Sequence, residues 1–155
     1  MAEKPRTLIL GIGNILLGDE GIGVRVIEHL RNCPLPDSVD ILDGGTAGAD
    51  LLDTLCRYER VILIDAIDGN YPPGTIVQMT PDELQPPNPS ALSLHDLDLP
   101  QTLAMAKMLG QAPKEVIIIG IQPERIACTM ELSPRLKRLL PDVAERVSSL
   151  VNQPR

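Results

Sequence analysis

The sequence predicts a three-layer α/β/α sandwich around a mainly parallel sheet of roughly five strands. Short apolar runs with strand character alternate with segments of helical periodicity along the chain. The run at 61–64 is apolar at every position, which is typical of a central parallel strand covered on both faces. Because 155 residues is close to the usual size of one domain, we expect a single domain over 1–155, with right-handed crossovers between its parallel strands.

The first half of the chain contains three expected strands and two expected helices. Glycines break the chain after the first strand, and Asp43, Gly44, Gly45 and Thr46 form a turn after the second. The leucines of the second helix fall on one side of it. The expected elements are strands at 7–12, 39–42 and 61–64 and helices at 21–31 and 50–57.

The second half begins with an expected strand at 75–79, after a Pro-Pro-Gly turn. Four prolines at 81–90 exclude regular structure there and predict a stiff surface loop. A helix is expected at 99–109 and a fifth strand at 116–121. Ser133 then fits the N-cap of a final helix that has Pro134 in its first turn. The buried stripe expected for this helix is Leu136, Leu139, Leu140, Val143, Val147 and Leu150.

Composition excludes several functional classes. The formal net charge is −7, and the chain has no Phe or Trp and only two Tyr, so neither a basic surface nor an aromatic platform for nucleic acid is expected. The core should be aliphatic. No apolar run approaches the roughly 20 residues of a membrane span, and we recognise no export signal, so we expect a cytoplasmic protein without a membrane partner. Cys33, Cys56 and Cys128 fit neither a disulfide framework nor a zinc ribbon, and we expect reduced thiols in packing positions.

The glycines after the first strand raise the possibility of a nucleotide-binding loop. The dinucleotide fingerprint needs a third glycine where this chain has Leu16, and Asp19 and Glu20 would face the phosphates. The chain contains no Gly-Lys-Ser or Gly-Lys-Thr sequence, so a P-loop is excluded. Nucleotide binding is therefore the weaker interpretation.

Nucleophilic catalysis is limited by the presence of only two histidines, His29 and His95. His29 falls among apolar residues of the first helix, where a half-exposed structural histidine is expected. His95 has no Gly-x-Ser-x-Gly motif to accompany it. A thiol enzyme that pairs Cys128 with His95 ranks low, because a lone cysteine is usually a small buried hydrophobe.

A mixed set of possible metal ligands follows from the expected topology. Glu20 follows the first strand, Asp65 ends the third, and His95 lies in the loop after the fourth. Two carboxylates and an imidazole suit a divalent transition metal with open positions for an incoming ligand. The alternative is that Glu20 and Asp65 are turn or helix-start carboxylates and that His95 is a satisfied loop residue. From spacing alone, that alternative is favoured.

Six segments together resemble the nickel-iron hydrogenase maturation proteases. The most specific is Leu-Gly-Ile-Gly-Asn-Ile-Leu-Leu-Gly-Asp-Glu-Gly-Ile-Gly-Val at 10–24. The others match in the same order over nearly the whole chain. They are Leu-Asp-Gly-Gly-Thr-Ala-Gly at 42–48, Ile-Asp-Ala at 64–66, Ser-Leu-His-Asp at 93–96, Gly-Ile-Gln-Pro-Glu at 120–124 and Leu-Ser-Pro at 132–134.

The resemblance implies an endopeptidase that removes the C-terminal extension of a nickel-iron hydrogenase large-subunit precursor after nickel insertion. It implies metal-site roles for Glu20, Asp65 and His95, which reverses the preference above. It also places Asp19, as a further catalytic residue, and the turn Asp43, Gly44, Gly45 and Thr46, as a substrate-binding element, in the same cleft. A purely structural role is an equal alternative in each case: capping for Asp19, and loop geometry imposed by the glycines for the turn. Nickel is expected to arrive with the precursor, although other divalent metals could occupy the site.

Mechanism and assembly stay open at this point. The metal could activate water, or it could only dock the substrate while Asp19 or Glu20 acts as general base. The chain contains no His-Glu-x-x-His motif, so an ordinary zinc protease is not expected. A non-catalytic nickel-sensing or metallochaperone module that binds the same precursor is the alternative function. We expect a monomer.

Overall fold

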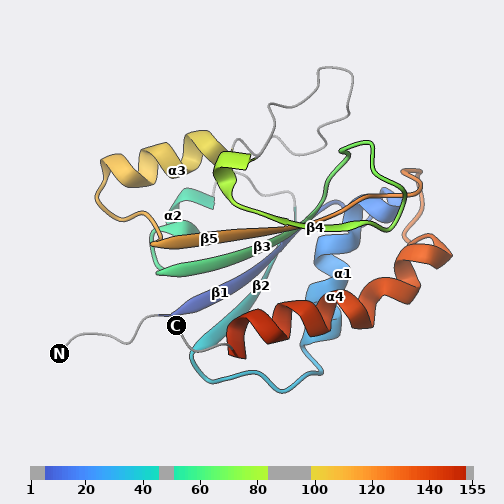
Figure 1. The fold of residues 1–155 in the computed structure, drawn as a ribbon, viewed down its shortest axis with the longest axis horizontal. Coiled ribbons are helices and arrows are strands. Elements are labelled where there is room, and N and C mark those ends of the chain that lie inside the picture. Colours follow the sequence, from blue (N-terminus) through green and yellow to red (C-terminus); the bar gives the residue numbers. More distant parts are fainter. Residues whose placement is uncertain (1–5, 46–50, 84–98, 153–155) are drawn as a thin grey trace.

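The computed structural model describes residues 6–45, 51–83 and 99–152, and these ranges form a five-stranded sheet between two layers of helices (Figure 1). The strand order is β2-β1-β3-β5-β4. Four strands are parallel, and β4 pairs antiparallel with β5 at one edge. The expected fold class is confirmed. The strands are β1 Thr7–Ile12, β2 Val39–Gly45, β3 Arg60–Ala66, β4 Ile76–Met79 and β5 Glu115–Ile121.

The helices divide between the two faces of the sheet, with α1 and α4 on one face and α2 and α3 on the other (Figure 1). Two short 3₁₀ turns, η1 and η2, precede α1 and follow β4. The described helical elements are η1 Gly18–Gly21, α1 Ile22–Leu30, α2 Leu51–Leu55, η2 Pro81–Glu83, α3 Leu99–Met108 and α4 Pro134–Asn152.

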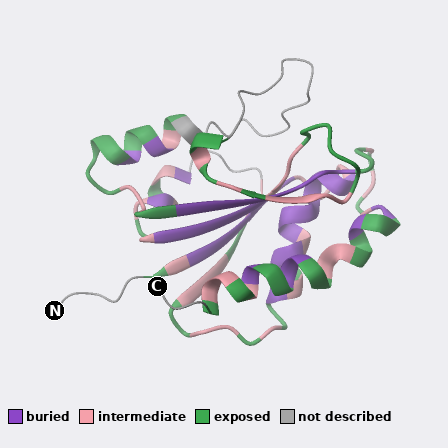
Figure 2. Cartoon of the chain, viewed as in Figure 1, coloured by how far each residue is buried: buried purple, intermediate pink, exposed green. Residues whose placement is uncertain are grey.

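Strand side chains alternate between two aliphatic core clusters. Along β3, Ile62 and Ile64 face α1 and α4, whereas Val61 and Leu63 face α2 and α3. The central strands are buried along most of their length in Figure 2. Neither cluster contains an aromatic residue among its buried members, which confirms the expected aliphatic core.

Element boundaries differ from the sequence prediction at several points. The first helix begins one residue later than expected because residues 18–21 form a 3₁₀ turn, and α2 ends at Leu55 rather than at 57. Strand β2 continues through the expected turn as far as Gly45, because β1 supplies a hydrogen-bonding partner along that stretch. At the start of α4, the Ser133 carbonyl accepts from the Lys137 N–H, as an N-cap residue does.

The cysteines and His29 can be placed directly. His29 is half-buried on α1, as predicted. All three cysteines are free. The prediction that they pack in the interior is wrong for Cys128, which is exposed in the loop after β5, and only partly right for Cys33 and Cys56, which are half-buried. No helix in the described part of the chain has the length and apolarity needed to cross a membrane.

Candidate active site

The parallel strands end at one edge of the sheet, where ligands of open α/β sheets usually bind. The strand register aligns their last residues in one row. Gly11 of β1 lies opposite Asp43 of β2 on one side and Ile64 of β3 on the other. Asp65 follows Ile64 and lies opposite Gly120 of β5. The predicted carboxylates Asp43 and Asp65 therefore lie at the same edge, with β1 between their strands.

Glycines place Glu20 close to Asp65. A Cβ atom on Gly23, in the first turn of α1, would lie 2.4 Å from the Ile12 carbonyl oxygen and 2.3 Å from that of Ile64. Helix α1 therefore begins directly on the backbone of β1 and β3, an approach that a side chain at this position would prevent. Because Glu20 is three residues before Gly23 and Asp65 directly follows Ile64, the two carboxylates are brought to the same part of the edge.

Glu20 is buried and Asp65 is half-buried. Glu20 is only 3% exposed. Its Oε1 atom and the Oδ1 atom of Asp65 are buried. Carboxylate oxygens suit divalent cations, and two from neighbouring strand ends can supply part of a coordination sphere. Their chemistry therefore fits the predicted metal-site role.

The same glycines disfavour the nucleotide interpretation. A Cβ atom on Gly13 would lie 2.3 Å from the Glu20 carbonyl oxygen, and one on Gly11 would lie 2.3 Å from that of Gly23. These glycines permit contact between segments of the protein's own backbone. The space that a pyrophosphate would need is filled by the turn that carries Glu20 beside Gly13 and by helix α1 beside Gly11.

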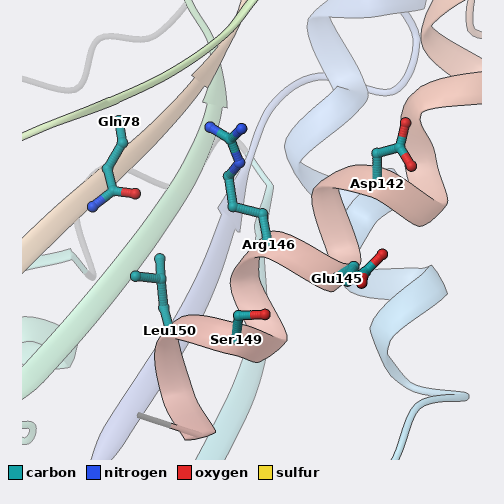
Figure 3. A pocket seen from close by; sticks show the side chains of 6 residues that line it. All are labelled: Gln78, Asp142, Glu145, Arg146, Ser149 and Leu150. Carbon is teal, nitrogen blue, oxygen red and sulfur yellow. The ribbon is translucent and has the colours of Figure 1, made fainter.

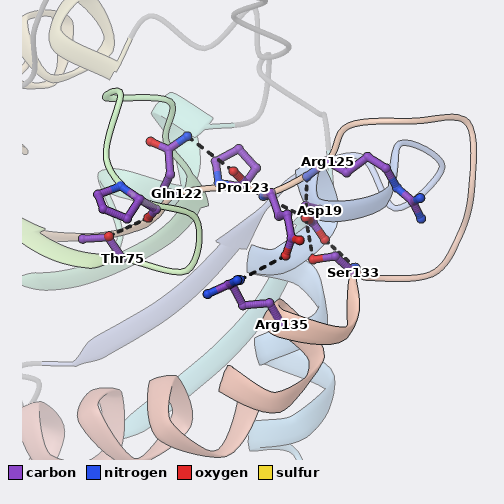
Figure 4. Close-up of polar contacts among 9 residues, drawn as sticks. Asp19, Thr75, Gln122, Pro123, Arg125, Ser133 and Arg135 are labelled. Carbon is purple, nitrogen blue, oxygen red and sulfur yellow. Dashed lines mark hydrogen bonds and ion pairs between the residues drawn. The ribbon is translucent and has the colours of Figure 1, made fainter.

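Asp19 is completely buried and connects three segments of the chain (Figure 4). Its Oδ1 atom accepts a hydrogen bond from the Ser133 N–H at 2.7 Å. Its Oδ2 atom accepts from the N–H groups of Glu124, at 3.0 Å, and Arg125, at 2.9 Å, and from the Ser133 hydroxyl at 2.8 Å. These four contacts favour the alternative in which Asp19 shapes the loops: it holds the chain after β5 against the turn that carries Glu20.

Gln122 has a similar organising role that the sequence did not reveal. It is buried directly after β5. Its Oε1 atom accepts from the N–H groups of Gly69, at 2.9 Å, and Tyr71, at 3.2 Å, and its Nε2 atom donates to Asp68 at 3.2 Å. Gln122 thereby orders the loop that follows Asp65. The available signal was a polar residue placed immediately after a buried parallel strand.

Asp43, Gly44 and Gly45 are the last residues of the edge strand β2; Asp43 is exposed and the two glycines are half-buried. The Asp43 Oδ1 atom accepts from the Gly45 N–H at 2.9 Å. Gly45 has a φ of 51°, a left-handed conformation that favours glycine. The Gly44 and Gly45 backbone thus lies beside Gly11 and Ile12 of β1. Two strand spacings, about 10 Å, separate β2 from β3 in such a sheet, so Asp43 belongs to the rim of the site.

Two predicted site residues, His95 and Thr46, lie outside the described residues. Within 6–45, 51–83 and 99–152, no three His, Cys, Asp or Glu side chains gather in a way that could hold a metal ion. The described part of the predicted ligand set is the pair Glu20 and Asp65.

Two surface hollows lie away from this edge. One is between β4 and α4, where Figure 3 shows Gln78 opposite charged side chains of α4. The other runs along β2, beside Tyr58 and Arg57. Neither is lined by Glu20 or Asp65. Glu20 and Asp65 at the carboxyl edge therefore remain the candidate active site.

Comparisons with known proteins agree with this assignment. The chain is 36% identical to the hydrogenase 2 maturation protease of Escherichia coli K12 over 96% of this chain and 92% of the relative. It is 37% identical to the hydrogenase expression/formation protein HupD of Thiocapsa roseopersicina, covering 97% of this chain but 66% of the relative's length. Several further HupD relatives are also longer, and the chain spans 60–65% of them.

Solved structures share the fold. The hydrogenase maturating endopeptidase HybD of E. coli superposes with a TM-score of 0.83 at 36% identity, covering 94% of this chain and 91% of that one. A hydrogenase 2 maturation peptidase from a Thaumarchaeota archaeon gives a TM-score of 0.72 at 32% identity, with 95% and 98% covered. The family model described as hydrogenase maturation protease matches residues 24–150. The predicted resemblance and enzyme class are thus confirmed at the level of the family, and the chain belongs to the hydrogenase maturation proteases.

Proposed function

We propose that this protein is an endopeptidase that removes the C-terminal extension of a nickel-iron hydrogenase large-subunit precursor once nickel has been inserted. The single observation that carries the proposal is the placement of two carboxylates at the carboxyl edge of the sheet: the buried Glu20 and the half-buried Asp65, each with one buried carboxylate oxygen. Membership of the maturation-protease family supplies the reaction class.

Nickel enters this proposal as part of the substrate. Glu20 and Asp65 provide oxygen ligands, and His95 is the proposed nitrogen ligand. Such a set leaves positions for ligands that the precursor itself contributes. A precursor without nickel would lack the group that these residues recognise, so binding would be selective for the loaded form.

The remaining predicted site residues receive different roles. Both oxygens of Asp19 accept hydrogen bonds from the protein, so Asp19 is proposed as a positioning residue rather than as the base that accepts a proton from water. Asp43, Gly44 and Gly45 at the end of β2, together with Thr46, are proposed to contact the precursor at the border of the site. A monomeric, cytoplasmic protein remains our expectation.

Mass spectrometry of a nickel-loaded precursor, with a nickel-free precursor beside it, tests the proposal. We expect the wild type to release one defined C-terminal peptide from the loaded form alone. Glu20→Gln, Asp65→Asn and His95→Ala should each slow release by about 100-fold or more, because metal affinity depends steeply on every ligand. Glu145→Gln, an exposed glutamate on α4, is a matched control and should cleave normally.

The outcomes separate the candidate functions. Cleavage at the normal rate by His95→Ala and Glu20→Gln would contradict the proposed site. Binding of the loaded precursor without any change in its mass would replace the protease with the alternative, a nickel-sensing or metallochaperone module. Protection against thermal unfolding by a mononucleotide or dinucleotide would instead revive nucleotide binding.

A further inference from the structure

We infer that an exposed apolar rim beside Glu20 docks the precursor polypeptide. The inference rests on the proposed function and adds a binding surface to it. The apolar rim consists of Leu16, in the loop before η1, and of Ile126, Cys128 and Met130, in the loop after β5. These side chains lie outside the carboxylate site itself.

The rim residues are exposed although they are apolar. Leu16 is 58% exposed, Ile126 38% and Met130 56%. In the second loop, exposure alternates along the chain: Ile126, Cys128 and Met130 are exposed, whereas Ala127 and Thr129 are half-buried. The half-buried positions face the left-handed Gly18, where a Cβ atom would lie 3.3 Å from Thr129 Cγ2 and 3.5 Å from the Ala127 carbonyl oxygen.

Both loops are held in place by hydrogen bonds from their backbones. The Gly18 N–H donates to the Thr129 carbonyl at 2.7 Å, and the Arg25 guanidinium donates to the Met130 carbonyl at 2.6 Å. Asp19 holds the second loop at Arg125 and at Ser133. The rim is therefore ordered before any partner arrives, which lowers the entropy cost of docking.

The Leu16 end of the rim is fixed in the same way. The Leu16 N–H donates to the Asn14 side chain at 2.9 Å. In the next turn, the Glu20 N–H lies 3.4 Å from the Leu17 carbonyl, and Leu17 forms a parallel bridge with Thr129. A short, connected stretch of backbone thus joins the rim to the carboxylate that we propose binds nickel.

This continuity with the proposed site determines the occupant. A precursor whose nickel is bound at Glu20 brings polypeptide to this part of the molecule, and the loops joined to the Glu20 turn present exposed apolar side chains there. Arg125, next to Ile126, directs its side chain away from Asp19 in Figure 4 and is exposed. The partner segment is therefore expected to be apolar, with a carboxylate or carbonyl group for this guanidinium.

A second exposed apolar group provides the comparison surface. Met105 and Met108 lie in the last turns of α3, and Leu109 directly follows it, in the layer opposite to α1 and α4 (Figure 1). Met108 is 87% exposed. The chain runs from there to the start of β5, at the amino edge of the sheet, so this group is remote from the rim.

The decisive experiment compares Met130→Gln with Met108→Gln in processing of the loaded precursor. We expect the Met130 variant to raise KM about tenfold, a typical loss for an interface side chain, while kcat and the thermal midpoint stay unchanged. The Met130 contact with Arg25 uses the backbone carbonyl and survives the substitution. The Met108 variant should match the wild type in all three quantities.

The exposed thiol gives a second, independent measurement. Alkylation of Cys128, followed by mass spectrometry, should slow about tenfold or more when saturating loaded precursor is present, because the docked chain covers the rim. Cys33 and Cys56, both half-buried elsewhere, should react at the same rate with and without precursor.

Equal KM values for the two methionine variants, or unchanged alkylation of Cys128, would overturn the inference. If sedimentation shows that Met130→Gln changes the oligomeric state, and this change accounts for its altered KM, the rim would instead be an interface with a second copy of this chain. Failure of the wild type to process or bind the loaded precursor would remove the proposed function itself. If the wild type processes the precursor normally and Met130→Gln has a wild-type KM, only the inference of docking at the apolar rim is rejected.

Discussion

The two edges of the sheet both bury a charged side chain, but they use it differently. At the carboxyl edge, Asp19 is fully buried and is satisfied by backbone N–H groups and one hydroxyl. At the amino edge, Arg60 is 7% exposed. Its Nε atom lies 2.5 Å from Glu115 Oε1, and its Nη1 atom donates to the Leu150 carbonyl at 2.9 Å. The first charge orders two loops, and the second attaches the last turns of α4 to the sheet.

The two edges differ in whether the buried charge supports candidate site residues. The loops that Asp19 connects carry Glu20 and the apolar rim, whereas no predicted site residue accompanies Arg60. Interactions at the carboxyl edge should therefore affect both stability and processing. Interactions at the amino edge should affect stability alone.

The largest expected effect is that of Asp19→Ala. It would leave three N–H groups and the Ser133 hydroxyl without their acceptor, and we expect a loss of about 4 kcal/mol in the free energy of unfolding. Processing should fall with it, because the turn that carries Glu20 loses its support. Urea unfolding and the precursor assay measure the two effects.

Ser133→Ala provides the graded control for this prediction. It removes only the hydroxyl, so a loss of about 1 kcal/mol is expected while the Ser133 N–H contact remains. Wild-type stability and processing in Asp19→Ala would show that the carboxyl edge does not depend on this buried carboxylate.

An intermediate effect is expected for Arg60→Ala. The Leu150 carbonyl would lose its donor, while Glu115, whose side chain is 49% exposed, can be solvated by water. We expect a loss of about 2 kcal/mol in the free energy of unfolding. The kcat and KM of the folded protein should stay at wild-type values, and a change in kcat would break the distinction between the two edges.

The smallest effect is expected at Tyr58, beside Arg60 on the amino side of the molecule. Its hydroxyl donates to Asp40 at 2.8 Å. Burial, together with the hydrogen bond to Asp40, raises the pKa of Tyr58 above its usual value. Tyr58→Phe should cost about 1 kcal/mol at neutral pH, with no effect on processing.

The pH dependence of this variant has a definite sign. Because the pKa is raised in the folded state, the stabilisation by Tyr58 is complete below about pH 10, the unfolded pKa, and is lost as pH rises through the folded pKa. The stability difference between wild type and Tyr58→Phe should therefore be larger at pH 9 than at pH 11. A constant difference across this interval would show that the hydroxyl does not titrate as the contact with Asp40 requires.

Much of the candidate site could be anticipated from the sequence because strand ends are marked locally. Glu20 follows the glycines after β1, and Asp65 directly follows the apolar run of β3. The organising residues could not be anticipated in this way. Asp19 and Ser133 are 114 residues apart in the sequence, and Gln122 and Gly69 are 53 residues apart. No local periodicity records such partners.

Two further structural features also depend on contacts between distant segments and could not be predicted from the sequence. The strand character of 76–79 is visible in the sequence, but its antiparallel pairing at the edge depends on β5, which comes much later in the chain. The exposure of Cys128 was also mispredicted, because the loop presents it to solvent while Ala127 and Thr129 face Gly18.

Periodicity, composition and contiguous motifs specify the alternation of strands and helices, the aliphatic core, the family and the two carboxylates at strand ends. The folded molecule alone reveals that Asp19 holds loops together, that Gln122 orders the chain after Asp65, and that four exposed apolar side chains lie on the loops connected to the Glu20 turn. Hydrogen-bond partners and solvent exposure depend on which distant segments the fold brings into contact, and no local pattern in the chain records those contacts.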